Sequence, residues 1–332
     1  MSDLSVVIPT LGRRPALARA LARLRGQPAL GEVLLVADAQ ADHAAVERTW
    51  KAARLPGRLL HAGRPGASAA RNAGWRAARG AVVLFLDDDV LVETGTLGVH
   101  ARAHTEHPAE ADAVLGGVRW ADGLRVTAFM RWVERGLQFD FAALAPGQIT
   151  GWWHFYTAHA SVKRSLLARA GGFDEEGLPF GYEDLDVAKR MAEAGGLRLR
   201  HLPAARAEHE HAMTLEGWRA QVARIAWAER RFVARHPEVA PFFHDRFAAV
   251  SGLRPRGRAA RVVDLVPAGL PGLGPRVHAA ARAYWEHELA AAFLAAWEAA
   301  AGEHPGPPPR PETLAAAAQD DPVATSPGDR LA

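Results

Sequence analysis

Short, almost unbroken apolar runs alternate with helical patterns through the first 120 residues, and this alternation limits the fold more than any other feature. A strand with one exposed face would alternate apolar and polar residues, so unbroken runs indicate strands covered on both faces. The runs predict strands at 4–10, 32–38, 57–63 and 81–87. The chain should therefore form an α/β fold with a mixed, mostly parallel central sheet and helices on both faces.

The residue types at segment ends predict where two of the intervening helices begin and stop. The segment 14–26 ends near Gly26. In the segment 68–80, Ser68 is a candidate N-cap and Gly80 follows the last helical residue. Both helices lie between predicted strands, as the crossovers of a parallel sheet require.

The pattern is less regular after about residue 112. It predicts a strand, an aromatic strand-like segment, a loop leading into a helix, a final strand and two helices, at 111–120, 147–162, 171–196, 197–203, 214–235 and 277–301. We expect three parts: a domain at 1–215, a helical C-terminal extension at 216–302 with a basic Pro- and Gly-rich linker, and a disordered tail at 303–332.

Composition excludes several classes of protein. The chain has no cysteine, which rules out disulfides, cysteine-bound zinc and thiol nucleophiles. A net charge of only +3 argues against a nucleic-acid partner. The N-terminus enters a strand-like run at once, and no apolar stretch reaches the roughly 18 residues of a spanning helix. We therefore expect a cytoplasmic protein.

One stretch, 253–282, is locally basic. It carries six arginines against one acid: Arg254, Arg256, Arg258, Arg261, Arg276 and Arg282 against Asp264. Two interpretations remain open. The stretch is either a solvated linker in an arginine-rich chain or a surface that contacts an anionic membrane, which would place the protein at the inner face of that membrane.

Three adjacent acids, Asp87, Asp88 and Asp89, follow the apolar run 81–87. A turn or helix cap explains one of them, and an acid–base pair with raised pKa values is a second interpretation. A hard divalent cation explains all three better, because the carboxylates that bind it share its positive charge. The triplet therefore favours a Mg²⁺ or Mn²⁺ site.

Other polar residues also follow apolar runs. Pro9 and Thr10 end the first run, and Asp38 ends the second. In an open parallel sheet such strand ends converge at the ligand site. Arg71 and Asn72 lie near a predicted helix start, where arginine opposes the helix dipole. This arrangement indicates either an anionic partner such as a pyrophosphate or an ordinary helix start.

Two later clusters carry further candidates. Glu183 and Asp184 begin a predicted helix, where they are either acids favoured by the helix dipole or a general base beside a cleft. His209 and His211 follow the predicted final strand. They are either surface residues or ligands that complete a metal site with Asp89.

In this order, the motifs "VVIPT", "VADAQAD", "GASAARNAG", "FLDDDV" and "GGFDEEGLPFGYEDLDVAKR", with a later histidine, resemble family-2 glycosyltransferases of GT-A (Rossmann-like) fold. The resemblance covers about residues 4 to 215. It implies transfer of a sugar, of hexosyl type, from a nucleotide-diphosphate donor to an acceptor hydroxyl. It also implies inversion at the anomeric carbon, assistance by a divalent metal, and a place in polysaccharide biosynthesis.

The resemblance also implies residue roles. It assigns the nucleotide to Pro9, Thr10, Asp38, Arg71, Asp87 and Asp88, the metal to Asp89 and His209 with His211 as the alternative, and general-base catalysis to Asp184 in "YEDLD".

Two features depart from the family pattern or lie outside it. The second strand usually ends in two acids followed by Gly and Ser, but here Ala37 precedes Asp38, so the choice among UDP, dTDP and GDP stays open. Trp152, Trp153 and Glu183 are candidate acceptor residues, although paired tryptophans are usually core. The acceptor could be a carbohydrate, a lipid-linked sugar or a small molecule.

Two other functions remain as alternatives. One is a non-catalytic protein of the same fold that binds a sugar nucleotide or polysaccharide, although such a protein would have no need of Asp184. The other is a nucleotidyltransferase, which also binds metal through carboxylates. It would need a Gly- and Arg-rich phosphate loop after the first strand, and "TLGRRPALA" resembles such a loop only faintly.

Overall fold

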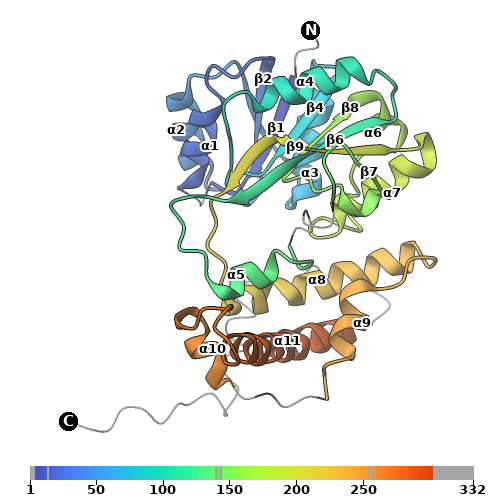
Figure 1. Ribbon diagram of the computed structural model, residues 1–332. Helices are drawn as coiled ribbons and strands as arrows, with labels where there is room; N and C mark the ends of the chain where they lie inside the picture. The colour runs from blue at the N-terminus through green and yellow to red at the C-terminus, as the bar shows by residue number, and fades with distance from the viewer. Residues whose placement is uncertain are drawn as a thin grey trace. The chain divides into compact units, whose positions relative to one another are not determined.

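The computed structural model describes residues 4–12, 15–138, 141, 144–252, 255 and 257–301 (Figure 1). The chain divides into two compact units, Met1–Ala212 and Met213–Ala332. The expected tail at 303–332, together with Arg254 and Arg256 of the basic stretch, lies outside the described residues.

Nine strands in the described part of the first unit form one sheet, in the order β3-β2-β1-β4-β8-β6-β9-β5 with β7 beside β9. Their bounds are β1 Leu4–Thr10, β2 Leu30–Ala37, β3 Gly57–His61, β4 Val82–Leu86, β5 Val90–Val92, β6 Asp112–Trp120, β7 Ile149–Thr150, β8 His159–Lys163 and β9 Arg198–His209. Strands β1 to β4 pair in parallel, as do β6 and β9, while β8 runs antiparallel between β4 and β6. The prediction of a mixed, mostly parallel sheet is confirmed.

Helices cover both faces of the sheet (Figure 1). These helices are α1 Ala16–Leu24, α2 His43–Ala53, α3 Ala67–Ala77, α4 Thr96–Glu106, α6 Arg164–Arg169 and α7 Glu183–Gly195. A further short helix, α5 Ala128–Val133, follows β6 in the chain. Successive residues of β1 point to opposite faces: Val6 and Ile8 share a core with α1, α2 and α4, and Val7 shares one with α3, α6 and α7. This two-sided burial explains why the strands are apolar throughout.

Two sequence predictions were wrong in detail. The final strand, predicted at 197–203, continues to His209, because β6 pairs with it as far as Trp120 and β5 pairs with its last residues. His209 therefore ends a strand and does not follow one. The segment 147–162 is not one strand but β7, a 3₁₀ turn at Trp152–His154 and β8.

The second unit is helical, in agreement with the predicted extension. It contains α8 Leu215–Arg235, α9 Phe242–Ala248, α10 Arg258–Val262, a 3₁₀ turn at Val263–Leu265 and α11 Gly274–Ala299. The buried carboxylate of Glu229 accepts hydrogen bonds from the backbone N–H groups of Phe243 and His244, and so caps α9. Among the described residues, no helix is long and apolar enough to cross a membrane.

A chain of buried histidines joins α4 to the sheet. His104 and His100 both contact the hydroxyl of Ser161, at 2.8 Å each, and His100 Nε2 lies 3.1 Å from His159 Nε2. Lys163 Nζ lies 3.2 Å from His104 Nδ1 and can only donate. At the other end, His159 Nδ1 is 3.3 Å from a backbone carbonyl, which can only accept. The donors can therefore all point one way, from Lys163 through the rings and Ser161 to the carbonyl. Each ring then accepts one hydrogen bond and donates one in its neutral form.

Burial keeps these three histidines uncharged. It lowers the pKa of His100 well below the usual value, the pKa of His104 to about 3 and the pKa of His159 to about 4. Neighbouring rings and the ammonium of Lys163 lower these pKa values further for His100 and His104. A proton added to any ring would place two donors face to face.

Acid should therefore weaken the fold, because the unfolded histidines take up protons near pH 6.5 while the folded ones do not. The free energy of unfolding should decrease as pH falls from about 6.5 toward 4, by up to about 1.4 kcal/mol per pH unit for each histidine. His104→Gln can still donate to Ser161 and accept from Lys163 but cannot titrate, so its stability should decrease less steeply. Urea unfolding at several pH values measures both slopes, and equal slopes would contradict this explanation.

Candidate active site

The site lies where the central parallel strands end. Strand β1 ends at Thr10, and its neighbour β4 is followed directly by the acidic triplet. The hydroxyl of Thr10 donates to Asp88 Oδ2 at 2.6 Å and accepts from the backbone N–H of Gly12 at 2.9 Å. The contact between Thr10 and Asp88 therefore joins the ends of β1 and β4.

Asp38 follows the adjacent strand β2 and is buried. Its Oδ2 accepts from the backbone N–H of Gly66 at 2.7 Å, and its Oδ1 accepts from that of Gln40 at 2.8 Å. The carboxylate thus ties the end of β2 to the loop that precedes α3. Pro9 lies within β1, opposite Val36 of β2.

Arg71 connects three elements of the site. It projects from α3 and is only 5% exposed. Its Nη1 lies 2.6 Å from Glu183 Oε1 at the start of α7, and its Nη2 lies 3.0 Å from Asp87 Oδ1 after β4. Burial alone would lower the pKa of Arg71, but Glu183, Asp87 and Asp184 raise it. The guanidinium therefore stays charged among three carboxylates.

Asn72, the next residue, holds the loop that leads to α7. Its side-chain amide donates to the Phe173 carbonyl at 2.8 Å and to Glu175 Oε1 at 2.7 Å. Its carbonyl oxygen accepts from the Phe173 N–H at 3.0 Å and from Trp75 Nε1 at 2.7 Å. All four hydrogen-bonding positions of this fully buried amide are therefore satisfied. Asn72 fixes the loop before α7, and Arg71 fixes the start of α7 through Glu183.

Asp184 lies in the first turn of α7. Gly181 and Tyr182, with φ of 72° and 61°, turn the chain sharply into this helix. Burial, followed by the charge of Glu183, raises the pKa of Asp184 to about 7, while Arg71 and the Leu185 N–H oppose the increase. A carboxyl that titrates near neutral pH can accept a proton from a substrate.

Asp186, the other acid of "EDLD", has a different environment. It is fully buried and forms an ion pair of 2.6 Å with Arg190, one helical turn later. Arg190 also donates to the carbonyl of Gly172 at 2.7 Å. Asp186 is thus a structural residue, whereas the side chain of Asp184 has no cationic partner within 4 Å among the described residues.

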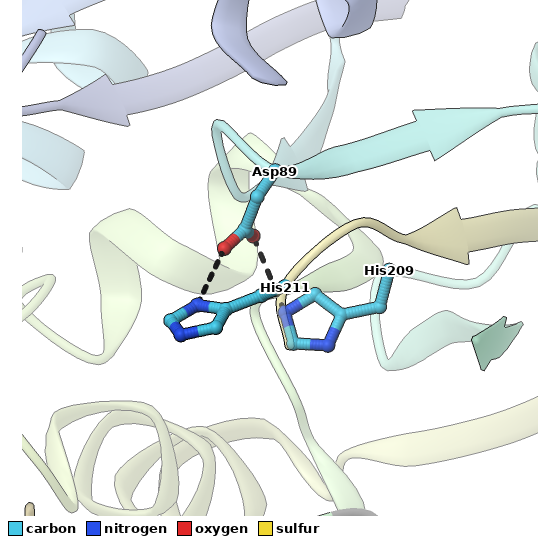
Figure 2. A group of neighbouring side chains, drawn as sticks. All are labelled: Asp89, His209 and His211. Carbon is cyan, nitrogen blue, oxygen red and sulfur yellow. Dashed lines mark hydrogen bonds and ion pairs between the residues drawn. The ribbon is translucent and has the colours of Figure 1, made fainter. Parts of the chain in front are cut away.

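A candidate metal site lies beside the acidic triplet. His209 Nε2 is 3.4 Å from Asp89 Oδ1, and His211 Nδ1 is 3.3 Å from Asp89 Oδ2. Figure 2 shows the two rings side by side, one at each oxygen. Neighbouring ligands of an octahedral ion at 2.0–2.1 Å lie about 3 Å apart, so this set of one carboxylate and two imidazoles fits a small divalent cation.

A cavity of about 220 Å³ borders this cluster, and His211 forms part of its wall. The His211 ring is therefore accessible from the cavity. The cavity walls come from the start of α1 and the segment after β9: Pro15, Ala16, Arg19, Glu210, His211 and Ala212. Strand pairing brings Asp89 and His209 together, because Val90, the residue after Asp89, aligns with His209. His211 follows two residues after the end of β9.

The remaining sequence candidates lie toward α7. Glu183 is buried against Arg71 and Trp152 is partly buried, while Trp153 is 53% exposed. Gly151 leaves room for the Trp153 ring, which a Cβ at that position would approach to 2.2 Å. The sequence offered no sign of Phe173, whose ring faces the Arg71 guanidinium at 5.9 Å.

Comparison with known proteins identifies a family and relatives of this chain. Residues 5–169 match the model of glycosyl transferase family 2. Validoxylamine A glucosyltransferase from Streptomyces hygroscopicus subsp. limoneus is 27% identical, over 83% of this chain and 69% of that protein. The same enzyme from subsp. jinggangensis is 26% identical, over 83% of this chain and 74% of that protein.

Solved structures agree on the fold. A mannosyltransferase from Pyrobaculum calidifontis, in complex with GDP-Man and Mn²⁺, superposes with a TM-score of 0.52 at 24% identity, covering 96% of this chain and 79% of its own. S. aureus TarS 1-349 with UDP gives a TM-score of 0.50 at 17% identity, covering 90% of each chain. Residues 5–169 therefore form a domain of glycosyl transferase family 2, and the chain is a glycosyltransferase of GT-A fold.

Proposed function

We propose that this enzyme transfers a hexosyl group from a nucleoside-diphosphate sugar to an acceptor hydroxyl, with inversion and with Asp184 as the general base. The observation that carries the proposal is the environment of Asp184. It lies in the first turn of a helix, its pKa is about 7, and it neighbours the Arg71 cluster at the sheet edge. A single base and a direct attack on the anomeric carbon invert its configuration.

The donor would bind across the ends of β1, β2 and β4. Thr10, Asp38 and Asp88 lie there, and the neighbouring mannosyltransferase and TarS were solved with GDP-Man and UDP. The two Streptomyces relatives are named as glucosyltransferases, so glucosyl donors are the first to test.

Asp89, His209 and His211 would hold a divalent cation, with Mn²⁺ or Mg²⁺ as the candidates. When bound, such an ion would neutralise charge on the diphosphate leaving group. Arg71 adds a fixed positive charge nearby and holds Asp87 and Glu183 in place.

The acceptor would bind near α7. The turn that carries Trp153 packs against α7, so an exposed indole lies on the side of the site that holds Asp184. A sugar or cyclitol ring could stack on it. The ionised carboxylate of Asp184 would then take the proton of the attacking hydroxyl.

A panel of nucleotide sugars, with simple glycosides and aminocyclitols as acceptors, tests the proposal. Release of nucleoside diphosphate that depends on both substrates is expected, and NMR of the product should show the anomeric configuration opposite to that of the donor. A retained configuration would contradict the single-base mechanism. Release of pyrophosphate from nucleoside triphosphates would favour a nucleotidyltransferase instead.

Replacing each of two acids of α7 with asparagine should change the stability of the fold in opposite directions. Asp184→Asn should reduce kcat about 10²- to 10⁴-fold while nucleotide binding stays intact, because only the proton acceptor is lost. It should also stabilise the fold at pH 8, since a folded pKa of about 7 means that ionisation between about pH 4 and 7 favours the unfolded chain. Asp186→Asn should instead destabilise the fold by about 3 kcal/mol, because it breaks a buried ion pair.

The two effects can be measured by steady-state kinetics, calorimetric nucleotide titration and thermal unfolding of the same preparations. Equal loss of transfer and nucleotide binding in Asp184→Asn would contradict its assignment as the base.

The rate should depend on pH through the base. With saturating donor, kcat should rise from about pH 6 and level off above pH 7 to 8, since only ionised Asp184 accepts a proton. Glu183→Gln removes the neighbouring charge that raises this pKa, so the rising limb should move to lower pH. An unchanged limb in this variant would show that Glu183 does not influence the base.

Nucleotide affinity should depend on the metal through Asp89. In wild type, Mn²⁺ should tighten binding of the nucleoside diphosphate, and a chelator should abolish the gain. Asp89→Ala should bind equally weakly with and without Mn²⁺, because it removes the carboxylate between the two imidazoles. His209→Ala and His211→Ala, measured by the same titration, show which ring contributes more. A full Mn²⁺ effect in Asp89→Ala would place the ion elsewhere.

A further inference from the structure

An exposed apolar patch lies between α10 and the start of α11. Four of the eight large apolar side chains that are exposed in the described part of the chain fall between residues 262 and 273. They are Val262, Leu265, Leu270 and Leu273, at 42, 77, 41 and 52% exposure. The other four, Leu11, Ile149, Trp153 and Phe242, are spread over the rest of the chain. The cluster at 262–273 therefore marks a candidate interaction surface, which we call the leucine patch.

The backbone under the leucine patch is well ordered by hydrogen bonds. His278 of α11 contacts the carbonyl of Val266 at 2.8 Å, and the N–H of Gly274 donates to the carbonyl of Leu270 at 2.8 Å. Gly274 is required here, because a Cβ would lie 2.4 Å from the carbonyl oxygen of Pro267. The turn is thus held against α11 while its leucines point away from the core.

Arginines flank the leucine patch in the sequence, on α10 and α11. Arg258, Arg261, Arg276 and Arg282 are all exposed, and Asp264 is the one acid between residues 258 and 282. Four positive charges against one negative charge leave an excess of three. Leucine with arginine is the combination that favours an anionic bilayer, since leucine enters the acyl boundary while guanidinium groups pair with lipid phosphates.

We propose that the leucine patch and its arginines bind the surface of an anionic lipid bilayer. Charge complementarity selects this occupant over a second copy of the chain, because two such patches placed together would bring eight arginines into contact. Binding would be peripheral, through the turn at residues 262–273, and would concentrate the enzyme at the membrane.

The test measures binding of the full chain to vesicles in a flotation assay without donor or acceptor. Wild type should bind vesicles that contain phosphatidylglycerol and should bind phosphatidylcholine vesicles much more weakly. Leu265→Ser with Leu273→Ser should reduce the partition coefficient about tenfold or more, and exposed positions should tolerate these changes without unfolding. Arg261→Gln with Arg276→Gln should reduce both the binding and its sensitivity to salt.

Phe242→Ser is the matched control in the same unit. Phe242 is 54% exposed but begins α9, which contacts the other end of α11 through Phe243–Phe293 and His244–Trp297 ring pairs. This variant should bind vesicles as wild type does.

Three outcomes would overturn the proposal: no binding to anionic vesicles, equal loss in the Phe242 control, or unchanged binding in the double leucine variant. Self-association that the leucine changes abolish, without any vesicle binding, would identify a second copy as the occupant. Because no substrate is present, these outcomes are independent of the proposed transfer reaction.

Discussion

The site depends on one buried cation. Arg71 contacts Asp87 after β4 and Glu183 at the start of α7. Asp184 lies close enough to raise the pKa of Arg71 as well. One guanidinium cannot neutralise three carboxylates, and the negative charge that remains helps burial keep the pKa of Asp184 near 7. The property that makes Asp184 a candidate base therefore comes from its neighbours.

The buried histidine chain shows how a structural polar network differs from this cluster. His104, His100 and His159 are neutral, and each ring donates once and accepts once between Lys163 and a backbone carbonyl. Every polar group in that chain is satisfied, so it strengthens the contact of α4 with the sheet. In the Arg71 cluster, by contrast, Glu183 Oε2 and Arg71 Nε are buried and have no hydrogen-bond partner among the described residues. Incomplete pairing of this kind is frequent where a protein binds ligands or moves protons.

Much of the first unit could be predicted because its signals are local. Unbroken apolar runs identified β1, β2 and β4, and acids at a helix start identified α7. The errors came from long-range pairing. Nothing local shows that β5 will extend β9 to His209, and nothing in "GQITGWWHFYTAHASV" separates β7 from β8, because strand register is set by partners far away in the chain.

The sequence alone determined the α/β architecture and the residue types of the site, since apolar periodicity and strand-end acids are properties of short segments. Only the tertiary structure decided the partners of those residues. It paired Asp88 with Thr10, turned Arg71 toward two carboxylates, and placed His209 and His211 on the two oxygens of Asp89. The physical reason is that an ion pair or a hydrogen bond depends on distances of a few ångströms, and the packing of helices against the sheet sets those distances.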